Sequence, residues 1–366
     1  MARKLKSDKL LFLATLLLVC SSVVMVYSAS AVLAMEQYEQ PYFFLFKQVT
    51  WAVLGVCLLL AAMQVDYRKL KQPIVIWTAL GLSIAALVAV LFGPPINGTR
   101  RWFGFAGVGV QPSELAKVAV ILFAAAILER RMHRIDEVAY SLLPLAVVTG
   151  GVSGLIMLEP DFGTALTVLL IVGAMTFAAG LSYRYVIGAG AAMTPLLYML
   201  LTSADYRRRR LLAFLDPWDD PFGDGFQIIQ SQIAVGTGGV FGQGLMGGVQ
   251  KLFYLPYPHT DFIYAVIAEE TGLIGASVIL VCFGVITWRG LRVAALAPDR
   301  FGALVAVGLT TLVALQAFVN ISVVLGLMPT KGIPLPFVSA GGSSLLVSLL
   351  SMGVLVNISQ HASAGT

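Results

Sequence analysis

Residues 256–270 read PYPHTDFIYAVIAEE and place an aspartate, Asp261, directly before a long apolar stretch. A carboxylate in such a place can act as a general base, which accepts the proton of an attacking hydroxyl group. His259 and Thr260 are adjacent in sequence, but Asp261 is the only one of the three that stays anionic at neutral pH. A polar residue that merely marks the edge of a membrane span is the alternative interpretation.

Basic residues form the second candidate set. Four consecutive arginines occupy positions 207–210, and Arg101, Lys117 and Lys331 lie in or beside other polar segments. Guanidinium groups match phosphate oxygens two at a time, so these residues are candidates for binding a phosphorylated ligand. A cationic collar that touches lipid headgroups is the alternative for the arginines.

Acidic residues lie in the same polar segments. Pro112 opens a predicted helix on which Glu114 and Lys117 are three residues apart and therefore share one face. A lysine in a membrane helix should face protein or a water-filled groove, because it costs roughly 2.5 to 3.5 kcal/mol near the bilayer centre. A purely structural pair of Glu114 with Lys117 is the alternative. The segment LEPDFGTA adds Glu159 and Asp161 in a tight turn.

One carboxylate base surrounded by cations suits a particular chemistry. If a glycosyl group leaves a lipid-linked pyrophosphate for a sugar hydroxyl, the pyrophosphate needs cationic neutralisation rather than a general acid. The attacking hydroxyl needs one positioned base. Glycosidases ordinarily need a pair of carboxylates instead. The residues therefore favour glycosyl transfer at a membrane surface.

Other patterns do not support a site. The glycine-rich GTGGVFGQG at 236–244 matches neither the dinucleotide nor the P-loop pattern. The acidic residues between 216 and 224 do not fit a calcium loop, since position three from Asp220 is Phe222 and position twelve is Ser231. The 3 histidines and 3 cysteines are dispersed, which gives neither a metal cluster nor a disulfide framework.

Membrane helices must position these residues. The 366-residue chain is 58% hydrophobic and only 12% charged, with a mean hydropathy of +0.87, whereas a soluble domain has roughly 25% charged residues. The net charge of +5 matters through the side of the bilayer on which each basic residue lies, so nucleic acid is not an expected partner. We predict an all-α, polytopic integral membrane protein.

The hydropathy pattern predicts about ten transmembrane helices, since a span needs about 20 apolar residues. They lie near 10–30, 48–64, 73–92, 113–128, 140–157, 164–180, 186–202, 263–288, 301–327 and 342–360. One long extracytoplasmic loop, about residues 203–262, follows the seventh span, and its apolar residues from Phe226 to Val240 predict a helix in the membrane interface. The whole chain, 1–366, is predicted to form a single domain.

The lysines and arginines predict the orientation. Basic residues gather in the short loops on the side of the N-terminus, including Arg3, Lys4, Lys6 and Arg131, and are sparse in the opposite short loops. The positive-inside rule then places both termini in the cytoplasm and the long loop outside. The basic N-terminus also resembles a secretory signal, but its apolar run is long enough to span, so we predict an uncleaved first helix.

Several long motifs, in order along nearly the whole chain, carry a resemblance to a known family. They are GTRRWF, QPSELAK, LEPDFGTA, RLLAFLDPWDDPFGDGFQIIQSQIA, KLFYLPYPHTDFIYAVIAEETG and GLMPTKGIPLPFVSAGGSS. By these motifs the chain resembles the SEDS family, the shape, elongation, division and sporulation proteins. The resemblance implies a ten-helix glycosyltransferase that polymerises lipid II on the outer face of the cytoplasmic membrane, with a class B penicillin-binding transpeptidase as partner.

The resemblance also implies roles for single residues. Asp261 in HTDF matches the family's essential catalytic residue. Arg101 in TRRW and Lys117 in PSELAK match its functional basic positions, with Glu114 close by. We expect further substrate contacts from Arg207, Arg210, Lys331 and Ser343, and support for Asp261 from His259, Glu269 and Glu270. No cofactor is required by these residues, and a divalent cation, Mg²⁺ or Mn²⁺, is an open alternative.

Two motifs bear on the biological role. PTKG and LFYLP resemble the cell-division branch of the family more than the elongation branch, so septal wall synthesis is expected, with other division membrane proteins and membrane lipids as partners. An elongation-type polymerase is the alternative within the family. A lipid II flippase, with charges at several depths, broken helices and often an internal repeat, and a non-catalytic scaffold are the alternatives from other classes.

Overall fold

The computed structural model describes residues 7–95, 99–105, 108–252 and 254–362, so Arg3, Lys4 and Lys6 of the predicted charge bias lie outside the described residues. Each predicted span coincides with a helix. The helices are α1 (Lys9–Tyr38), α2 (Phe43–Gln64), α3 (Pro73–Leu91), α4 (Pro112–Arg131), α5 (Leu143–Leu158), α6 (Phe162–Ala178), α7 (Tyr183–Thr202), α10 (Ile263–Leu296), α11 (Arg300–Val324) and α12 (Gly342–His361).

Apolar length makes most of these helices fit to cross a membrane. In the described part of the chain, 7 helices are long and apolar enough, namely α1, α2, α3, the helix Ala139–Leu158 that contains α5, α10, α11 and α12. Of the others, α6 is a shorter apolar helix, α4 contains the buried Glu114 and Lys117, and α7 contains Pro195. The chain is therefore an all-α, polytopic membrane protein, as the sequence predicted.

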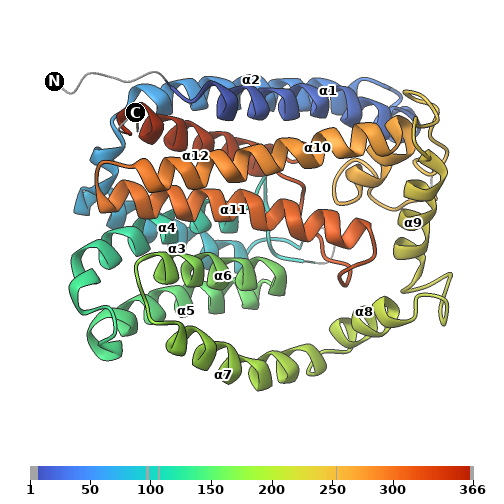
Figure 1. Ribbon diagram of the computed structural model, residues 1–366. Coiled ribbons are helices and arrows are strands. Elements are labelled where there is room, and N and C mark those ends of the chain that lie inside the picture. The colour runs from blue at the N-terminus through green and yellow to red at the C-terminus, as the bar shows by residue number, and fades with distance from the viewer. Residues whose placement is uncertain (1–6, 96–98, 106–107, 253, 363–366) are drawn as a thin grey trace.

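The helices run roughly side by side in one bundle, with α7 and α8 along its edge (Figure 1). α12 packs against α2, and α10 packs against α11 and α1. A Cβ atom at Gly353 would lie 2.7 Å from the carbonyl oxygen of Leu59, so only a glycine lets α12 approach α2 this closely. Such close packing holds membrane helices together, because lipid tails leave little hydrophobic force between them.

The candidate residues gather at one end of the bundle. Figure 1 shows the beginning of α1 and the end of α12 at one end of the bundle and α9 at the other, which we call the loop end. The loop end holds residues 203–262, including α8 (Asp205–Leu215) and α9 (Phe226–Gly238), and the first residues of α4, α6, α10 and α12. The segment between α7 and α10 contains a helix, α9, where the apolar residues from Phe226 to Val240 predicted one, and α9 packs against α10.

Short elements connect the spans. η1 (Tyr67–Lys71) and η2 (Met132–Arg134) are 3-10 helices, and η3 (Val138–Leu142) is a π-helix. Two strands, β1 (Phe103–Phe105) and β2 (Val108–Val110), pair antiparallel just before α4. The sequence did not predict this hairpin, because three-residue strands are too short to show an alternating pattern.

α10 is broken near its beginning, which corrects the prediction of one continuous span over 263–288. Gly272 has a φ of 66° and a ψ of −166°, outside the helical range. Residues 263–271 therefore form a short helical segment that follows Asp261 in the sequence. The rest of α10, up to Leu296, still exceeds the about 20 residues that a membrane span needs, so the segment 263–271 is not required for the crossing.

Candidate functional site

Asp261 lies at the loop end, immediately before α10. Its main chain is fixed from two sides. Nδ2 of Asn320 in α11 donates to the Asp261 carbonyl oxygen at 2.8 Å, and Oγ of Ser339 donates to the Thr260 carbonyl oxygen at 2.6 Å. Because both hydrogen bonds use main-chain acceptors, they set the point from which the carboxylate projects.

The surroundings make Asp261 a stronger base. Burial raises the pKa of its carboxyl from the usual 3.8 to about 6, against the opposing charges of Arg210 and Arg101 and with the help of the Asp161 charge. The carboxylate lies beside Gly332, where a Cβ atom would come within 3.1 Å of Oδ2. A general base works best with a pKa near the working pH, so this shift suits the predicted role.

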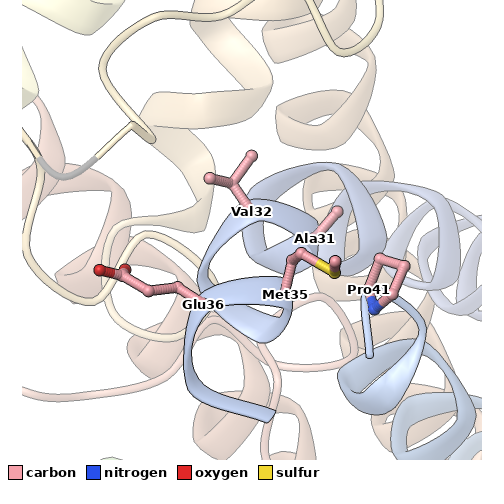
Figure 2. Close-up of a pocket in the computed structure, with 5 residues that line it drawn as sticks. All are labelled: Ala31, Val32, Met35, Glu36 and Pro41. Atoms are coloured by element: carbon pink, nitrogen blue, oxygen red, sulfur yellow. The ribbon is translucent and has the colours of Figure 1, made fainter. Parts of the chain in front are cut away.

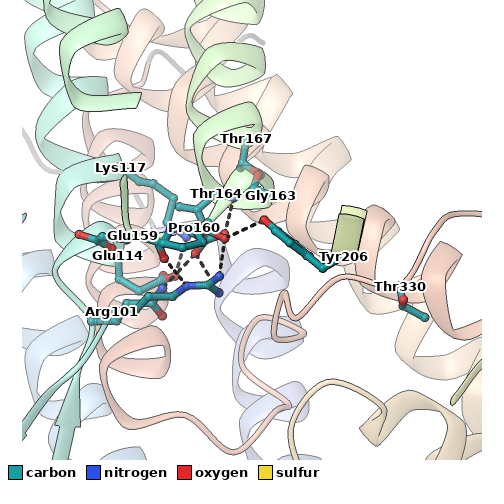
Figure 3. A network of polar contacts seen from close by, with 12 residues as sticks. Arg101, Glu114, Lys117, Glu159, Pro160, Gly163, Thr164, Thr167, Tyr206 and Thr330 are labelled. Carbon is teal, nitrogen blue, oxygen red and sulfur yellow. Dashed lines mark hydrogen bonds and ion pairs between the residues drawn. The ribbon is translucent and has the colours of Figure 1, made fainter. Parts of the chain in front are cut away.

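Arg101 binds the turn between α5 and α6 (Figure 3). Its Nε donates to the Glu159 carbonyl oxygen at 2.7 Å, and its Nη2 donates to the Pro160 carbonyl oxygen. Nη1 lies 3.9 Å from Oδ2 of Asp161, whose Oδ1 accepts from the Thr164 main chain at 3.0 Å and caps α6. The guanidinium group therefore holds a turn that carries two acidic side chains.

Glu159 is fully buried in this turn, with 0% of its surface exposed. Neither oxygen of its carboxyl has a hydrogen-bond partner among the described residues. Burial raises the pKa of this carboxyl to about 8, the Asp161 charge adds to the rise, and Arg101 opposes it. The Glu159 carboxyl is therefore neutral at pH 7, which the sequence alone did not reveal.

Glu114 and Lys117 share one face of α4, as their spacing predicted, and form the ion pair that was the alternative interpretation. Nζ of Lys117 lies 2.7 Å from Oε1 of Glu114, and the side chains are only 1% and 4% exposed. Figure 3 shows this pair beside Arg101 and Glu159. A buried charge is tolerated when it is paired, so Lys117 is already neutralised by its neighbour.

The four arginines divide between two surroundings, because successive helical residues point in different directions. Arg207 lies over the ring of Phe162 at 5.9 Å. Nη1 of Arg210 donates to the Thr330 carbonyl oxygen at 3.5 Å, and the charge of Arg210 acts on Asp261. Arg210 thus borders the site through its charge on Asp261, and Arg207 borders it beside Phe162, the residue that follows Asp161.

The other two arginines lie outside this border. Arg209 pairs with Asp224 across 3.4 Å, with both side chains largely in solvent at 65% and 42% exposure. Arg208 and Arg210 are both exposed, and of these two it is Arg210 whose charge acts on Asp261. An exposed pair of this kind contributes little to stability, so 207–210 does not act as one four-charge cluster.

Lys331 and Ser343 reach the site by different routes. Nζ of Lys331 lies 4.9 Å above the ring of Phe162, and burial lowers the pKa of this lysine while Asp161 opposes the shift. Ser343 is buried and its Oγ accepts from the Gln111 main chain at 3.3 Å. Nε2 of the Gln111 side chain in turn donates to Oδ2 of Asp161 at 3.4 Å. Ser343 therefore contacts the site through Gln111.

His259 packs against an aromatic ring of α2. Its ring lies against Phe44 with centroids 4.8 Å apart, and its main-chain oxygen accepts from Ala340 at 2.9 Å. Burial lowers the pKa of His259 to about 4, with a further contribution from Lys47. A neutral histidine in this place anchors the HTD segment by packing.

Glu269 and Glu270 lie at the far end of the helical segment 263–271 and are both 1% exposed. Their carboxylates bind residues of the long loop. They therefore do not join the group around Asp261. The structure brings together Asp261, Asp161, Arg101 and Arg210 as charges that act on one another.

The residues missed by the sequence analysis are mostly polar groups that hold the main chain. Asn320 is 1% exposed inside the apolar helix α11. A polar side chain within a span is a functional candidate by default, so Asn320 could have been found from sequence. Ser339 and Gln111 offered no such signal, since each lies in a segment that is polar anyway.

Two surface depressions in the described part of the chain lie outside this site. One of about 480 Å³ is lined by Ala31, Val32, Met35, Glu36 and Pro41, at the end of α1 (Figure 2). These residues are largely apolar, and none belongs to the group around Asp261. A second one is lined by apolar residues of α10 between Leu273 and Cys282.

The sequence matches the family described as "Cell cycle protein" (FtsW, RodA, SpoVE) over residues 8–364. The probable peptidoglycan glycosyltransferase FtsW of Geobacter metallireducens is 44% identical over 355 residues, which cover 96% of this chain and 94% of the relative. The stage V sporulation protein E of Bacillus subtilis is 41% identical over 365 residues, which cover 98% and 99%.

Solved structures are similar over the same length. A chain of a peptidoglycan synthase complex described as coordinating polymerization and crosslinking superposes with a TM-score of 0.79 at 30% identity, covering 97% of this chain and 98% of that one. The rod shape determining protein RodA of Thermus thermophilus gives 0.72 at 28% identity, covering 98% of each. With its fold, its HTDF segment and these matches, the chain belongs to the FtsW/RodA/SpoVE family, the SEDS proteins.

Proposed function

We propose that this protein is a peptidoglycan glycosyltransferase that polymerises lipid II at the loop end, with Asp261 as its general base. The observation that carries the proposal is the Asp261 carboxyl, which has a pKa of about 6 and is acted on by Arg210 and Arg101. Relatives named as probable peptidoglycan glycosyltransferases support the reaction class.

In the proposed reaction, the Asp261 carboxylate accepts the proton of the acceptor sugar's 4-hydroxyl. The hydroxyl oxygen forms a bond to the anomeric carbon of the donor sugar while the bond from that carbon to the lipid pyrophosphate breaks. The proton goes to Asp261, the negative charge goes to the pyrophosphate, and the anomeric centre is inverted. With a pKa of about 6, Asp261 is mostly ionised at pH 7 and still a stronger base than an ordinary aspartate.

The proposed binders of the pyrophosphate are Arg207, Arg210 and Lys331, which border the Asp261 site. Fixed cations aimed at developing negative charge lower the barrier most in a site that excludes water. Arg101 and Lys117 already bind the turn 159–161 and Glu114. We therefore assign them the role of shaping the site; substrate contacts from them would require an exchange of these partners.

A divalent cation fits this proposal only together with the substrate. Among the described residues, no group of three or more His, Cys, Asp or Glu side chains is placed to hold a metal ion. Mg²⁺ commonly uses one or two carboxylates together with substrate phosphates. Asp261 is the residue that would take part, and the ion would supply charge neutralisation at the pyrophosphate.

The proposed orientation places both termini in the cytoplasm and the loop end outside the cytoplasmic membrane, as the distribution of basic residues favours. A similar chain belongs to a peptidoglycan synthase complex described as coordinating polymerization and crosslinking. A class B penicillin-binding transpeptidase is accordingly the proposed partner. The FtsW relatives support a septal role with other division membrane proteins.

The break in α10 does not favour the flippase alternative. Broken helices in transporters expose main-chain groups to a substrate cavity. Here, the main-chain groups around Gly272 bind the loop residues 239–244. They are therefore unavailable as a transport site.

Purified protein in liposomes with lipid II, with and without a purified class B transpeptidase, tests the proposal. We expect glycan strands, resolved by gel electrophoresis, in at least the sample with the partner. Translocation of labelled lipid II without strand formation would support a flippase. The absence of both activities would support a scaffold.

A further inference from the structure

The glycine-rich motif at 236–244 and the break in α10 form one joint. A helix break leaves main-chain N–H and C=O groups that need new partners. Four main-chain hydrogen bonds supply them, from Gln243 N to Glu269 O (2.9 Å), Gly244 N to Glu270 O (3.0 Å), Leu273 N to Gly239 O (2.9 Å) and Ile274 N to Val240 O (3.3 Å). We call residues 238–244 and 268–274 together the glycine joint.

Glycines allow the two chains of the joint to approach. A Cβ atom at Gly242 would overlap the Glu270 carbonyl oxygen, and one at Gly272 would overlap the main chain of Gly242. Both glycines also have positive φ angles, 80° at Gly242 and 66° at Gly272, which side chains disfavour. The glycine-rich motif at 236–244, which matched no nucleotide-binding pattern, thus provides main-chain contacts to α10 at its break.

Glu270 ties the joint to α1 and to the next part of the loop. Its Oε1 lies 2.5 Å from Nζ of Lys251 and accepts from Oγ of Ser28 at 2.6 Å. Its Oε2 accepts from the Met246 main chain at 3.1 Å. The side chains of Glu270 and Lys251 are 0% and 4% exposed, so this ion pair is desolvated and depends on its full set of partners.

Glu269 binds the same loop from the neighbouring position. Its Oε1 accepts from the main-chain N–H groups of Val249 and Gln250 at 2.8 and 3.1 Å. Two adjacent carboxylates therefore fasten the end of the helical segment 263–271 to the loop. Asp261 precedes the other end of the same segment.

We propose that Glu269 and Glu270 are positioning residues for Asp261, and that the glycine joint and the helical segment 263–271 carry their effect to the carboxylate. This inference rests on the proposed function. A helical segment of this length transmits a shift at one end to the other, because its hydrogen-bonded turns do not fold independently. A misplacement of about 1 Å at a reacting group can cost roughly 100-fold in rate.

The test measures lipid II polymerisation by the purified full chain, with its transpeptidase partner where activity needs it, and compares Glu270→Gln with the parent. Glutamine keeps the shape of the side chain but removes the charge that holds Lys251. We expect kcat to fall roughly 10- to 100-fold, with KM changed much less.

The pH profile separates positioning from a simple loss of folded protein. If Asp261 moves towards water, its pKa falls from about 6 towards the usual 3.8, so the acid limb of the rate moves to lower pH. A smaller amount of intact protein would lower the rate at every pH and leave the midpoint in place.

A glycine pair supplies a matched control. Gly242→Ala places a Cβ against the Glu270 carbonyl oxygen and should cause the same loss of kcat and the same shift in pH midpoint. Gly236→Ala lies in α9 with open space around the added Cβ and should behave like the parent. Ser28→Ala removes one neutral donor to Glu270 and one acceptor for Lys251 but keeps the ion pair between Glu270 and Lys251, so it is the milder variant if Glu270→Gln does not fold.

The outcomes are distinguishable. An active parent whose Gly242→Ala and Ser28→Ala variants, and Glu270→Gln where it folds, keep the parental kcat and pH midpoint would overturn this inference alone. A parent that forms no strands with or without its partner would overturn the proposed function, and this inference with it.

Discussion

The buried carboxyl of Glu159 allows a test of the site's electrostatics that does not depend on activity. This side chain is fully buried, its two oxygens lack hydrogen-bond partners among the described residues, and burial raises its pKa to about 8. Replacing it with glutamine keeps the size and removes the possibility of ionisation. We expect Glu159→Gln to be more stable than the parent at neutral pH.

The magnitude follows from proton linkage. Each pKa unit is worth about 1.4 kcal/mol, so keeping the Glu159 carboxyl protonated at pH 7, against its usual pKa of 4.5, costs the folded state about 3 kcal/mol. Glutamine avoids this cost but buries an unsatisfied amide, which takes back about 1 kcal/mol. The expected gain at pH 7 is therefore about 2 kcal/mol.

The sign of the pH dependence is fixed by the raised pKa. For the parent, the contribution of Glu159 to stability is fully present below pH 4.5 and is lost as the pH rises towards 8. The variant should lack this loss. Thermal unfolding of both purified proteins in detergent between pH 4.5 and 8 measures it. Equal pH dependence in the two proteins, or a variant that is less stable at pH 8, would refute the reasoning.

Three further predictions concern the substrate side, Arg101 and the cell. In a variant without native cysteines, single cysteines at Asp219 and Lys331 should react with an impermeant thiol reagent from outside, and one at Arg131 should not; the reverse pattern would invert the orientation. Arg101→Ala should reduce polymerisation, and Arg101→Lys should only partly restore it, because an ammonium group cannot bind the carbonyl oxygens of the turn 159–161 as the planar guanidinium group does. Full activity of Arg101→Lys would show that the guanidinium geometry is not needed. Depletion in cells should give filaments with unfinished septa, whereas rounded cells with intact septa would indicate an elongation role.

The helices and the place of the site could be predicted from the sequence. Apolar runs of sufficient length fix the spans whatever their packing, and residues 203–262 appeared as the long loop for the same reason. Asp261 was recognisable because a carboxylate stood at the edge of an apolar run within a motif. Arg207 and Arg210 were candidates because of their charge. What distinguishes them from Arg208 and Arg209 is the helix α8, in which successive residues point in different directions.

The parts that depend on contacts between distant segments could not be predicted. Gly272 lies within an apolar run, and a single glycine there does not distinguish a break from a continuous helix. Its partner, the glycine-rich motif at 236–244, resembles a ligand loop in composition, and its sequence does not show that it contacts α10. Glu159 lies in a tight turn between two predicted spans, and its burial follows from the packing of α5, α6 and Arg101. Ser339 holds a main-chain atom from within a segment that is polar anyway, which leaves no mark in the sequence pattern.

The most direct test of the central claim compares lipid II polymerisation by the parent, by Asp261→Asn and by the matched control Asp219→Asn, in which the same substitution lies in an exposed part of the same loop. Loss of a general base typically lowers the rate by roughly 10² to 10⁴ fold. The polymerisation rate of Asp261→Asn should therefore fall by at least roughly 10² fold, while Asp219→Asn keeps the parental rate. The parental rate should fall as the pH drops through about 6, where Asp261 becomes protonated. An Asp261→Asn protein that polymerises lipid II within a few fold of the parent would contradict the account.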